Sequence, residues 1–144
     1  IATTFNRADK KKYKIRDNEI DFYSSISNNF KIEDIDSYNL SVKSKVIVTT
    51  YSTLGLELLS RGKRVLFLDP FHFLGGNYIN MFTKERSGSH WYAGHDQKII
   101  FDKIKYLENL KEEEWSKIQN TSPFKIKFDK KNKILKDIIK ENLK

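Results

Sequence analysis

The stretch that decides the fold runs from Val46 to Leu68 and reads VIVTTYSTLGLELLSRGKRVLFL. It contains two short apolar runs, within residues 45–50 and 63–69, that are rich in valine, isoleucine, leucine and phenylalanine. Both faces of each run are apolar, as in a central strand that is buried on both sides of a parallel sheet. We therefore predict a buried strand at each run.

The segment between the two runs, residues 52–62, predicts a helix. Ser52 or Thr53 is a suitable N-cap, and Gly62 stands where a glycine commonly ends a helix. Strand, helix and strand in succession form a βαβ unit, the building block of an open parallel sheet. The fold class that we expect is therefore α/β, a Rossmann-like open parallel sheet flanked by helices.

The rest of the chain alternates helix-forming and loop-forming segments. Residues 70–89 predict a long irregular loop with one proline and three of the six glycines, and a loop of this length in a compact domain is usually functional or mobile. Residues 90–94 predict a short strand or the wall of a pocket. The remaining patterns predict a short strand at 30–34 and helices at 17–29, 36–44, 96–110, 111–119 and 129–143.

Length and composition limit the class of protein. The chain has 144 residues, 38% of them hydrophobic, which suits one domain with a core. Because the chain does not begin with Met, we expect residues 1–144 to be a single domain from the C-terminal part of a longer protein. Without cysteine it has no disulfide, thiolate zinc site or cysteine nucleophile. Its sequence shows no transmembrane run and no signal peptide, so we expect a cytoplasmic location.

The net charge of +8, from 27 basic and 19 acidic residues, favours anionic partners such as nucleotides or a phospholipid surface. The same charge also fits a lysine-rich composition from an AT-rich genome. Much of the excess lies in residues 10–16 and 125–133, and neither segment interleaves aromatic residues in an RNA-binding pattern. We therefore expect no nucleic-acid partner.

The hydroxyl-rich turn after the first predicted strand is the candidate binding site. In an open parallel sheet, ligands bind beyond the carboxyl ends of the strands, where Ser52 and Thr53 fall. Backbone N–H groups at the start of a helix favour an anion, and these hydroxyls can add hydrogen bonds to phosphate oxygens. Glu57, further along the helix, can accept both hydroxyls of a ribose. The alternative is that these residues are an ordinary cap and an acid that compensates the helix dipole.

The motif Ser-Thr-Leu-Gly-Leu-Glu, residues 52–57, resembles the nucleotide-sugar motif in the C-terminal domain of GT-B glycosyltransferases. It looks most like bacterial O-antigen or capsule biosynthesis proteins, and epimerases of UDP-sugars and CDP-glycerol glycerophosphotransferases have related versions. The later stretch SGSHWYAGHDQKIIFDKIKYLENLKEEEW, residues 87–115, resembles the tail of the same family. The likeness covers roughly residues 19–119.

The resemblance implies a nucleotide-sugar donor as substrate, with no cofactor and no metal. By the motif, Ser52 and Thr53 contact phosphate and Glu57 contacts ribose. The other predicted donor-binding residues are Gly55 of the same motif, Thr50 of the hydroxyl-rich turn and His72, which lies in the loop after the second predicted strand. The alternative for His72 is an ordinary histidine of a surface loop. A GT-B enzyme has two Rossmann-like domains, so the acceptor site and general base would lie in an N-terminal domain outside this chain.

The sequence gives weaker support to the remaining candidate residues. His72, His90 and His95 have no zinc-site spacing. His90 and Trp91 could line the donor pocket or pack against the sheet. Three basic residues are possible pyrophosphate contacts, and the glycines at 75, 76 and 88 could permit a mobile loop or form plain turns. Those basic residues are Arg7, Lys84 and Arg86.

The leading hypothesis is thus the donor-binding half of a glycosyltransferase. It would move a sugar to a glycan or lipid-linked acceptor, at the anionic inner face of the membrane. The alternatives are a nucleotide-sugar epimerase, a glycerophosphotransferase or a non-enzymatic α/β binding module. No dinucleotide fingerprint, phosphate-binding NTPase loop or zinc-protease motif is present in the sequence.

Overall fold

A computed structural model describes residues 36–50, 52–70, 79–126, 133 and 136. By its contacts the chain divides into two compact units, residues 1–44 and 45–144. The helix and strand predicted at 17–29 and 30–34 lie outside the described residues. Of the helix predicted at 129–143, the two described positions are helical. That residues 1–144 form a single domain stays a prediction.

Helix α2, Ser37–Lys43, belongs to the first unit. Asp36 is its N-cap, and the carboxylate accepts hydrogen bonds of 3.0 Å each from the backbone N–H groups of Tyr38 and Asn39. Such a cap satisfies amides that have no partner within the helix. The short helix predicted to begin at residue 36 or 37 is therefore confirmed.

The described strands of the second unit form one four-stranded sheet in the order β1-β2-β4-β3. Its strands are β1 (Ile47–Thr49), β2 (Val65–Leu68), β3 (Ser87–Gly88) and β4 (Trp91–Tyr92). Strand β2 pairs in parallel with β1 on one side and β4 on the other, whereas β3 pairs antiparallel with β4. The predicted fold class, α/β with an open, mostly parallel, Rossmann-like sheet, is confirmed.

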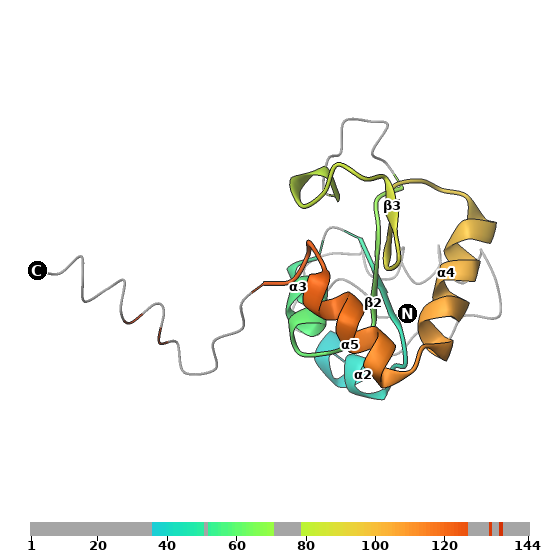
Figure 1. Ribbon diagram of the computed structural model, residues 1–144. Coiled ribbons are helices and arrows are strands. Elements are labelled where there is room, and N and C mark those ends of the chain that lie inside the picture. Colours follow the sequence, from blue (N-terminus) through green and yellow to red (C-terminus); the bar gives the residue numbers. More distant parts are fainter. Residues whose placement is uncertain (1–35, 51, 71–78, 127–132, 134–135, 137–144) are drawn as a thin grey trace, which may run out of the picture. The chain divides into compact units, whose positions relative to one another are not determined.

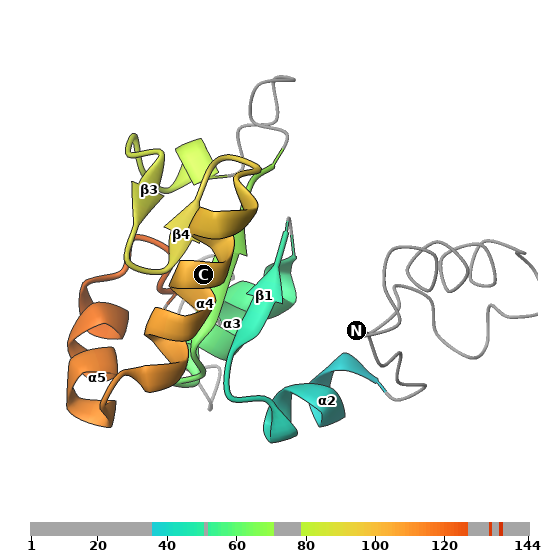
Figure 2. The ribbon, with the colours of Figure 1, turned by 90° about the vertical axis from the view of Figure 1, so that its right-hand side faces the viewer.

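Helices cover both faces of this sheet. Helix α3, Thr53–Ser60, and helix α5, Glu112–Thr121, lie on one face, and α4, Gln97–Asn109, lies on the other (Figure 1). Figure 2 shows α4 across the near face, with α3 behind the strands. All four residues of β2 are buried between these layers, as the apolar run predicted.

Side chains of β2 form the centre of the core. The Phe67 ring stacks on Phe124, with centroids 4.5 Å apart. Leu59, Leu107 and Trp115, one from each of the three helices, are also buried. The apolar residues that recur at helical spacing in these three segments of the sequence are thus the residues that the helices bury.

Helix α3 ends where the sequence predicts. Gly62 has φ +92, a left-handed conformation that glycine adopts without strain. Its carbonyl accepts a 2.8 Å hydrogen bond from the Trp115 indole, and the Leu59 carbonyl accepts one of 2.7 Å from the Gln119 amide. These bonds satisfy carbonyls at the end of α3 and attach α5 to it.

The predicted loop over residues 70–89 is wrong in its second half. A 3₁₀ turn, Ile79–Met81, and strand β3 lie within it, while residues 71–78 lie outside the described part. Pairing with β4 explains the strand, because the Ala93 N–H donates to the Arg86 carbonyl at 2.7 Å. The prediction for residues 90–94, a short strand or the wall of a pocket, is confirmed in both parts, because β4 lies there and residues 92–94 line a pocket.

Candidate functional site

The carboxyl ends of β1, β2 and β4 meet at one edge of the sheet, because these strands run parallel. From this edge the chain continues into the β1–α3 turn, into Asp69 after β2, and into the β4–α4 connection. Strands β1 and β4 flank β2, so they lie two strand spacings, about 10 Å, apart. Groups that follow these strands can therefore contact one extended ligand.

The β1–α3 turn carries most of the site residues predicted from the motif. Thr50 and Thr53 are exposed, and Ser52 is half-buried at the N-cap of α3. The Ser52 hydroxyl makes no capping hydrogen bond to the helix. In contrast, the Asp96 carboxylate caps α4 by accepting from two of its backbone N–H groups, at 2.9 and 3.2 Å. The Ser52 hydroxyl therefore does not act as an ordinary helix cap, which was the alternative that the sequence left open.

Gly55 allows α3 to approach the sheet closely. A Cβ atom at this position would lie 2.6 Å from Thr49 Cγ2 and 2.9 Å from Phe67 Cε1. Real side chains do not make contacts this short, so a larger residue would push the start of α3 away from β1 and β2. The glycine of the motif therefore has a packing role in the structure, beside the binding role that the resemblance implies.

Glu57 lies one turn beyond the start of α3. Its carboxylate accepts a 2.5 Å hydrogen bond from the Arg61 guanidinium, and its side chain is 27% exposed. This i,i+4 ion pair was not foreseen from the sequence, although the spacing itself is its signal. His72, the last predicted donor-binding residue, lies outside the described residues.

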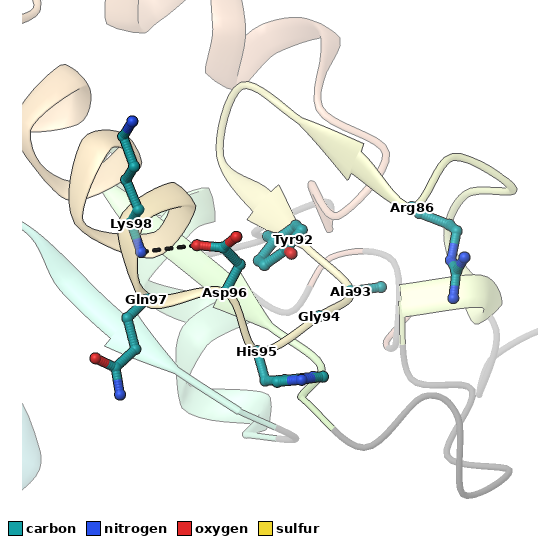
Figure 3. Close-up of a pocket in the computed structure, with 8 residues that line it drawn as sticks. All are labelled: Arg86, Tyr92, Ala93, Gly94, His95, Asp96, Gln97 and Lys98. Carbon is teal, nitrogen blue, oxygen red and sulfur yellow. Dashed lines mark hydrogen bonds between the residues drawn. The ribbon is translucent and has the colours of Figure 1, made fainter.

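A pocket opens at the end of β4 (Figure 3), with a volume of about 750 Å³. The side chains that line it come from β4, from the β4–α4 connection, from the first turn of α4 and from the residue before β3. They surround the backbone of residues 93 and 94 and are Arg86, Tyr92, His95, Asp96, Gln97 and Lys98. In Figure 3, Arg86 and His95 extend to the same side of that backbone.

The Tyr92 ring lies against Gly94. A Cβ atom on Gly94 would lie 2.5 Å from both Cζ and the hydroxyl oxygen of Tyr92. The glycine thus makes room for an aromatic ring at the pocket. Sequence reasoning named Arg86 as a contact and residues 90–94 as a possible pocket wall. It did not name as contacts the side chains of residues 95–98, which follow that segment at the start of α4.

Asp69 was also missed. It follows β2 directly, is 1% exposed, and its backbone N–H donates to the Tyr92 carbonyl at 3.0 Å. An acid directly after an apolar run was its sequence signal. Because β2 lies between β1 and β4, Asp69 lies at the carboxyl edge of the sheet, between the β1–α3 turn and the pocket.

His90 lies in the core, which confirms the alternative that it packs against the sheet. Its Nε2 lies 2.8 Å from the Ser122 hydroxyl and its Nδ1 3.2 Å from the Ser89 hydroxyl. Burial, and secondarily the charge of Lys103, lowers the pKa of His90 to about 4. Four rings surround it, those of Phe67, Trp91, Trp115 and Phe124.

Within the described part of the chain, no group of three histidine, aspartate or glutamate side chains could hold a metal ion. None of the described helices has the length and apolar character that crossing a membrane requires.

Comparison with known proteins relates residues 3–143 of the chain to one family. The model of a family described as "putative O-antigen biosynthesis protein" matches this range, which is nearly the whole chain. Neither a curated protein nor a solved structure matches the chain.

Proposed function

The chain belongs to this family of O-antigen biosynthesis proteins, and we propose that it binds the nucleotide-sugar donor of a glycosyltransferase. The observation that carries the proposal is the start of α3. There, exposed Thr53 and the Ser52 hydroxyl stand beside helix N–H groups at the carboxyl edge of a parallel sheet. This combination favours a phosphate group.

The donor would extend along the sheet edge from α3 to the pocket at the end of β4. Its phosphates would lie at Ser52 and Thr53, and its sugar would enter the pocket, where Tyr92 offers a ring and Gln97 an amide. The Arg86 guanidinium at the pocket can pair with phosphate oxygens. The separation of β1 and β4, about 10 Å, suits a ligand of this length.

Glu57 would accept the two ribose hydroxyls. Its present partner, Arg61, lies toward the end of α3. Binding of the ribose would therefore require the carboxylate to turn from Arg61 toward the start of the helix, or to hold both. The i,i+4 ion pair involves an Arg61 side chain that is 45% exposed and contributes only about 0.3–0.5 kcal/mol, so releasing Arg61 costs little.

In the proposed reaction, an acceptor hydroxyl attacks the anomeric carbon of the sugar, and the bond from that carbon to the donor phosphate breaks. The nucleotide leaves with the electron pair, and helix N–H groups and basic side chains stabilise its charge. We expect the general base that takes the proton, and the site for a glycan or lipid-linked acceptor, in an N-terminal domain. The location that we propose is cytoplasmic and peripheral at the inner membrane, with no nucleic-acid partner.

Calorimetry with UDP, GDP, CDP and CMP tests the donor site. We expect one nucleotide to bind, and the Ser52→Ala variant to lose roughly ten- to a hundredfold in affinity, because a hydrogen bond to a charged group contributes about 1.5–3 kcal/mol. Ser116→Ala, an exposed serine on α5, is the matched control and should bind as the unchanged chain does.

Two results would contradict the proposal: a folded chain that binds none of the four nucleotides, or equal losses in the two serine variants. Product analysis with the full-length protein then distinguishes the reaction class. An elongated glycan supports sugar transfer, whereas a free epimerised sugar or a transferred polyol phosphate supports one of the alternatives.

A further inference from the structure

A second hollow lies along one flank of α4, facing the β3–β4 hairpin. This α4 groove has a volume of about 420 Å³ and shares no lining residue with the pocket at the end of β4. The side chains that line it are Ser87, Ser89, Ile99, Asp102, Lys103 and Tyr106. It is thus built from two elements and is not the start of a helix alone.

The apolar part of the α4 groove is exposed. Ile99 is 38% and Tyr106 47% exposed. The core-facing side of α4 is formed by other residues, Ile100, Ile104 and Leu107. The exposed apolar surface of Ile99 and Tyr106 therefore adds little to the stability of the fold.

The polar part of the groove combines donors and acceptors. Ser87, Asp102 and Lys103 contribute a hydroxyl, a carboxylate and an ammonium to the lining, whereas the Ser89 hydroxyl already lies 3.2 Å from His90 Nδ1. The ammonium donates to the Gly88 carbonyl, its one acceptor among the described residues, and two of its three N–H groups remain for a ligand. Burial lowers the pKa of Lys103, so the amine is partly removed from water.

We propose that the α4 groove binds a saccharide segment of the glycan that O-antigen biosynthesis builds. A sugar ring has an apolar C–H face that can lie on Tyr106 and Ile99, and hydroxyls that both donate and accept hydrogen bonds. The groove supplies both kinds of surface. The proposal rests on the family and on this groove, not on the proposed donor site. It adds a second glycan contact to the acceptor site that we expect in an N-terminal domain.

The mixed polarity of the groove argues against other ligands. The Asp102 carboxylate opposes a phosphate or another compact anion, because like charges repel. A lipid chain or an apolar peptide segment would cover the Ser87 hydroxyl, the Asp102 carboxylate and the remaining N–H groups of Lys103 without offering them a hydrogen-bond partner, which costs free energy. A neutral sugar can pack its C–H face on the Tyr106 ring and form hydrogen bonds with the polar groups of the groove.

Saturation-transfer NMR and calorimetry on the full chain test the proposal. The probes are N-acetylglucosamine, rhamnose and the saccharide chain released by mild acid from the lipopolysaccharide of the source organism. We expect the saccharide chain to bind, and Tyr106→Ala to weaken it about tenfold or more through the lost ring contact. Asp102→Asn should weaken binding less, since an amide still accepts a hydrogen bond.

Phe101→Ala is the matched control. Phe101 lies on the same helix, is 56% exposed and packs with Lys105, outside the groove. We expect it to leave saccharide affinity unchanged. Both aromatic side chains are exposed, so neither variant should unfold the chain, and thermal unfolding verifies this.

Three results would overturn the proposal. The first is that no saccharide probe binds at millimolar concentration, even when a nucleotide still binds. The second is an equal loss in the Tyr106 and Phe101 variants. The third is a change of molecular mass in light scattering for Tyr106→Ala with unchanged saccharide affinity, which would make the groove an interface between two copies of the chain. Loss of nucleotide binding alone bears only on the donor site.

Discussion

At the scale of single residues, Gly55 determines how closely α3 approaches the sheet. The space for a Cβ atom is already taken by Thr49 Cγ2 and by the ring of Phe67, which stacks on Phe124. We expect Gly55→Ala to lower the free energy of unfolding by about 1–3 kcal/mol, the usual cost of overpacking a core. Urea denaturation of the variant and of the unchanged chain measures this loss of stability.

A second substitution tests the cause of that loss. Thr49→Ser removes Cγ2, the nearest atom at 2.6 Å, and keeps the hydroxyl. In the Gly55→Ala background it should recover part of the lost stability, so that the two effects are not additive. Strict additivity would show that the contact with Thr49 is not what the alanine disturbs.

At the scale of elements, Arg64 joins three of them. It precedes β2, and its Nη1 donates to the carbonyls of Leu107 and Glu108 at 3.1 and 3.0 Å, near the end of α4. Its Nη2 lies 2.5 Å from the Glu112 carboxylate at the start of α5. One guanidinium thus donates hydrogen bonds to carbonyls at the end of α4, where a helix leaves its carbonyls without partners of its own. The same group contacts the start of α5 and so stabilises the junction of the two helices.

We expect Arg64→Lys to destabilise the chain by about 1–3 kcal/mol, because an ammonium on a flexible stem cannot reproduce the planar fork. The control Arg61→Lys alters an ion pair whose arginine side chain is 45% exposed, against 14% for Arg64, and should change stability by less than about 0.5 kcal/mol. Urea denaturation of both variants compares them, and equal losses would count against the role of Arg64 at the junction.

At the scale of the whole molecule, stability should depend on pH through His90. Its pKa is about 4 in the folded chain, below the ordinary histidine value of 6.5, so the unfolded chain binds the proton more tightly. The stability that neutral His90 provides is full above pH 6.5 and falls as the pH drops from about 6.5 to about 4. A shift of this size corresponds to about 3 kcal/mol.

Denaturation at pH 7, 6, 5 and 4 measures this loss. His90→Gln keeps a polar group between Ser89 and Ser122 but does not titrate, so its stability should vary less over this range. The same pH dependence in His90→Gln and in the unchanged chain would assign the effect to the carboxylates instead.

Much of the fold and part of the candidate site follow from local sequence. The βαβ unit of residues 46–68 could be predicted because two apolar runs, a residue type favoured at the N-cap position and Gly62 all lie within one stretch of chain. Helices α4 and α5 could be predicted for the same reason, since amphipathic periodicity is local. The order of the motif also placed Ser52 and Thr53 at the start of α3.

Only the tertiary structure decided which distant segments meet. Strand β3 exists because β4 pairs with it, and the order β1-β2-β4-β3 brings the β4–α4 pocket to the same edge as the β1–α3 turn. The α4 groove needs the hairpin and the helix together. Such contacts depend on long-range pairing and packing, which neither propensity nor periodicity encodes. The sequence by itself therefore determined the elements and the motif, and the tertiary structure determined the pockets that the elements enclose.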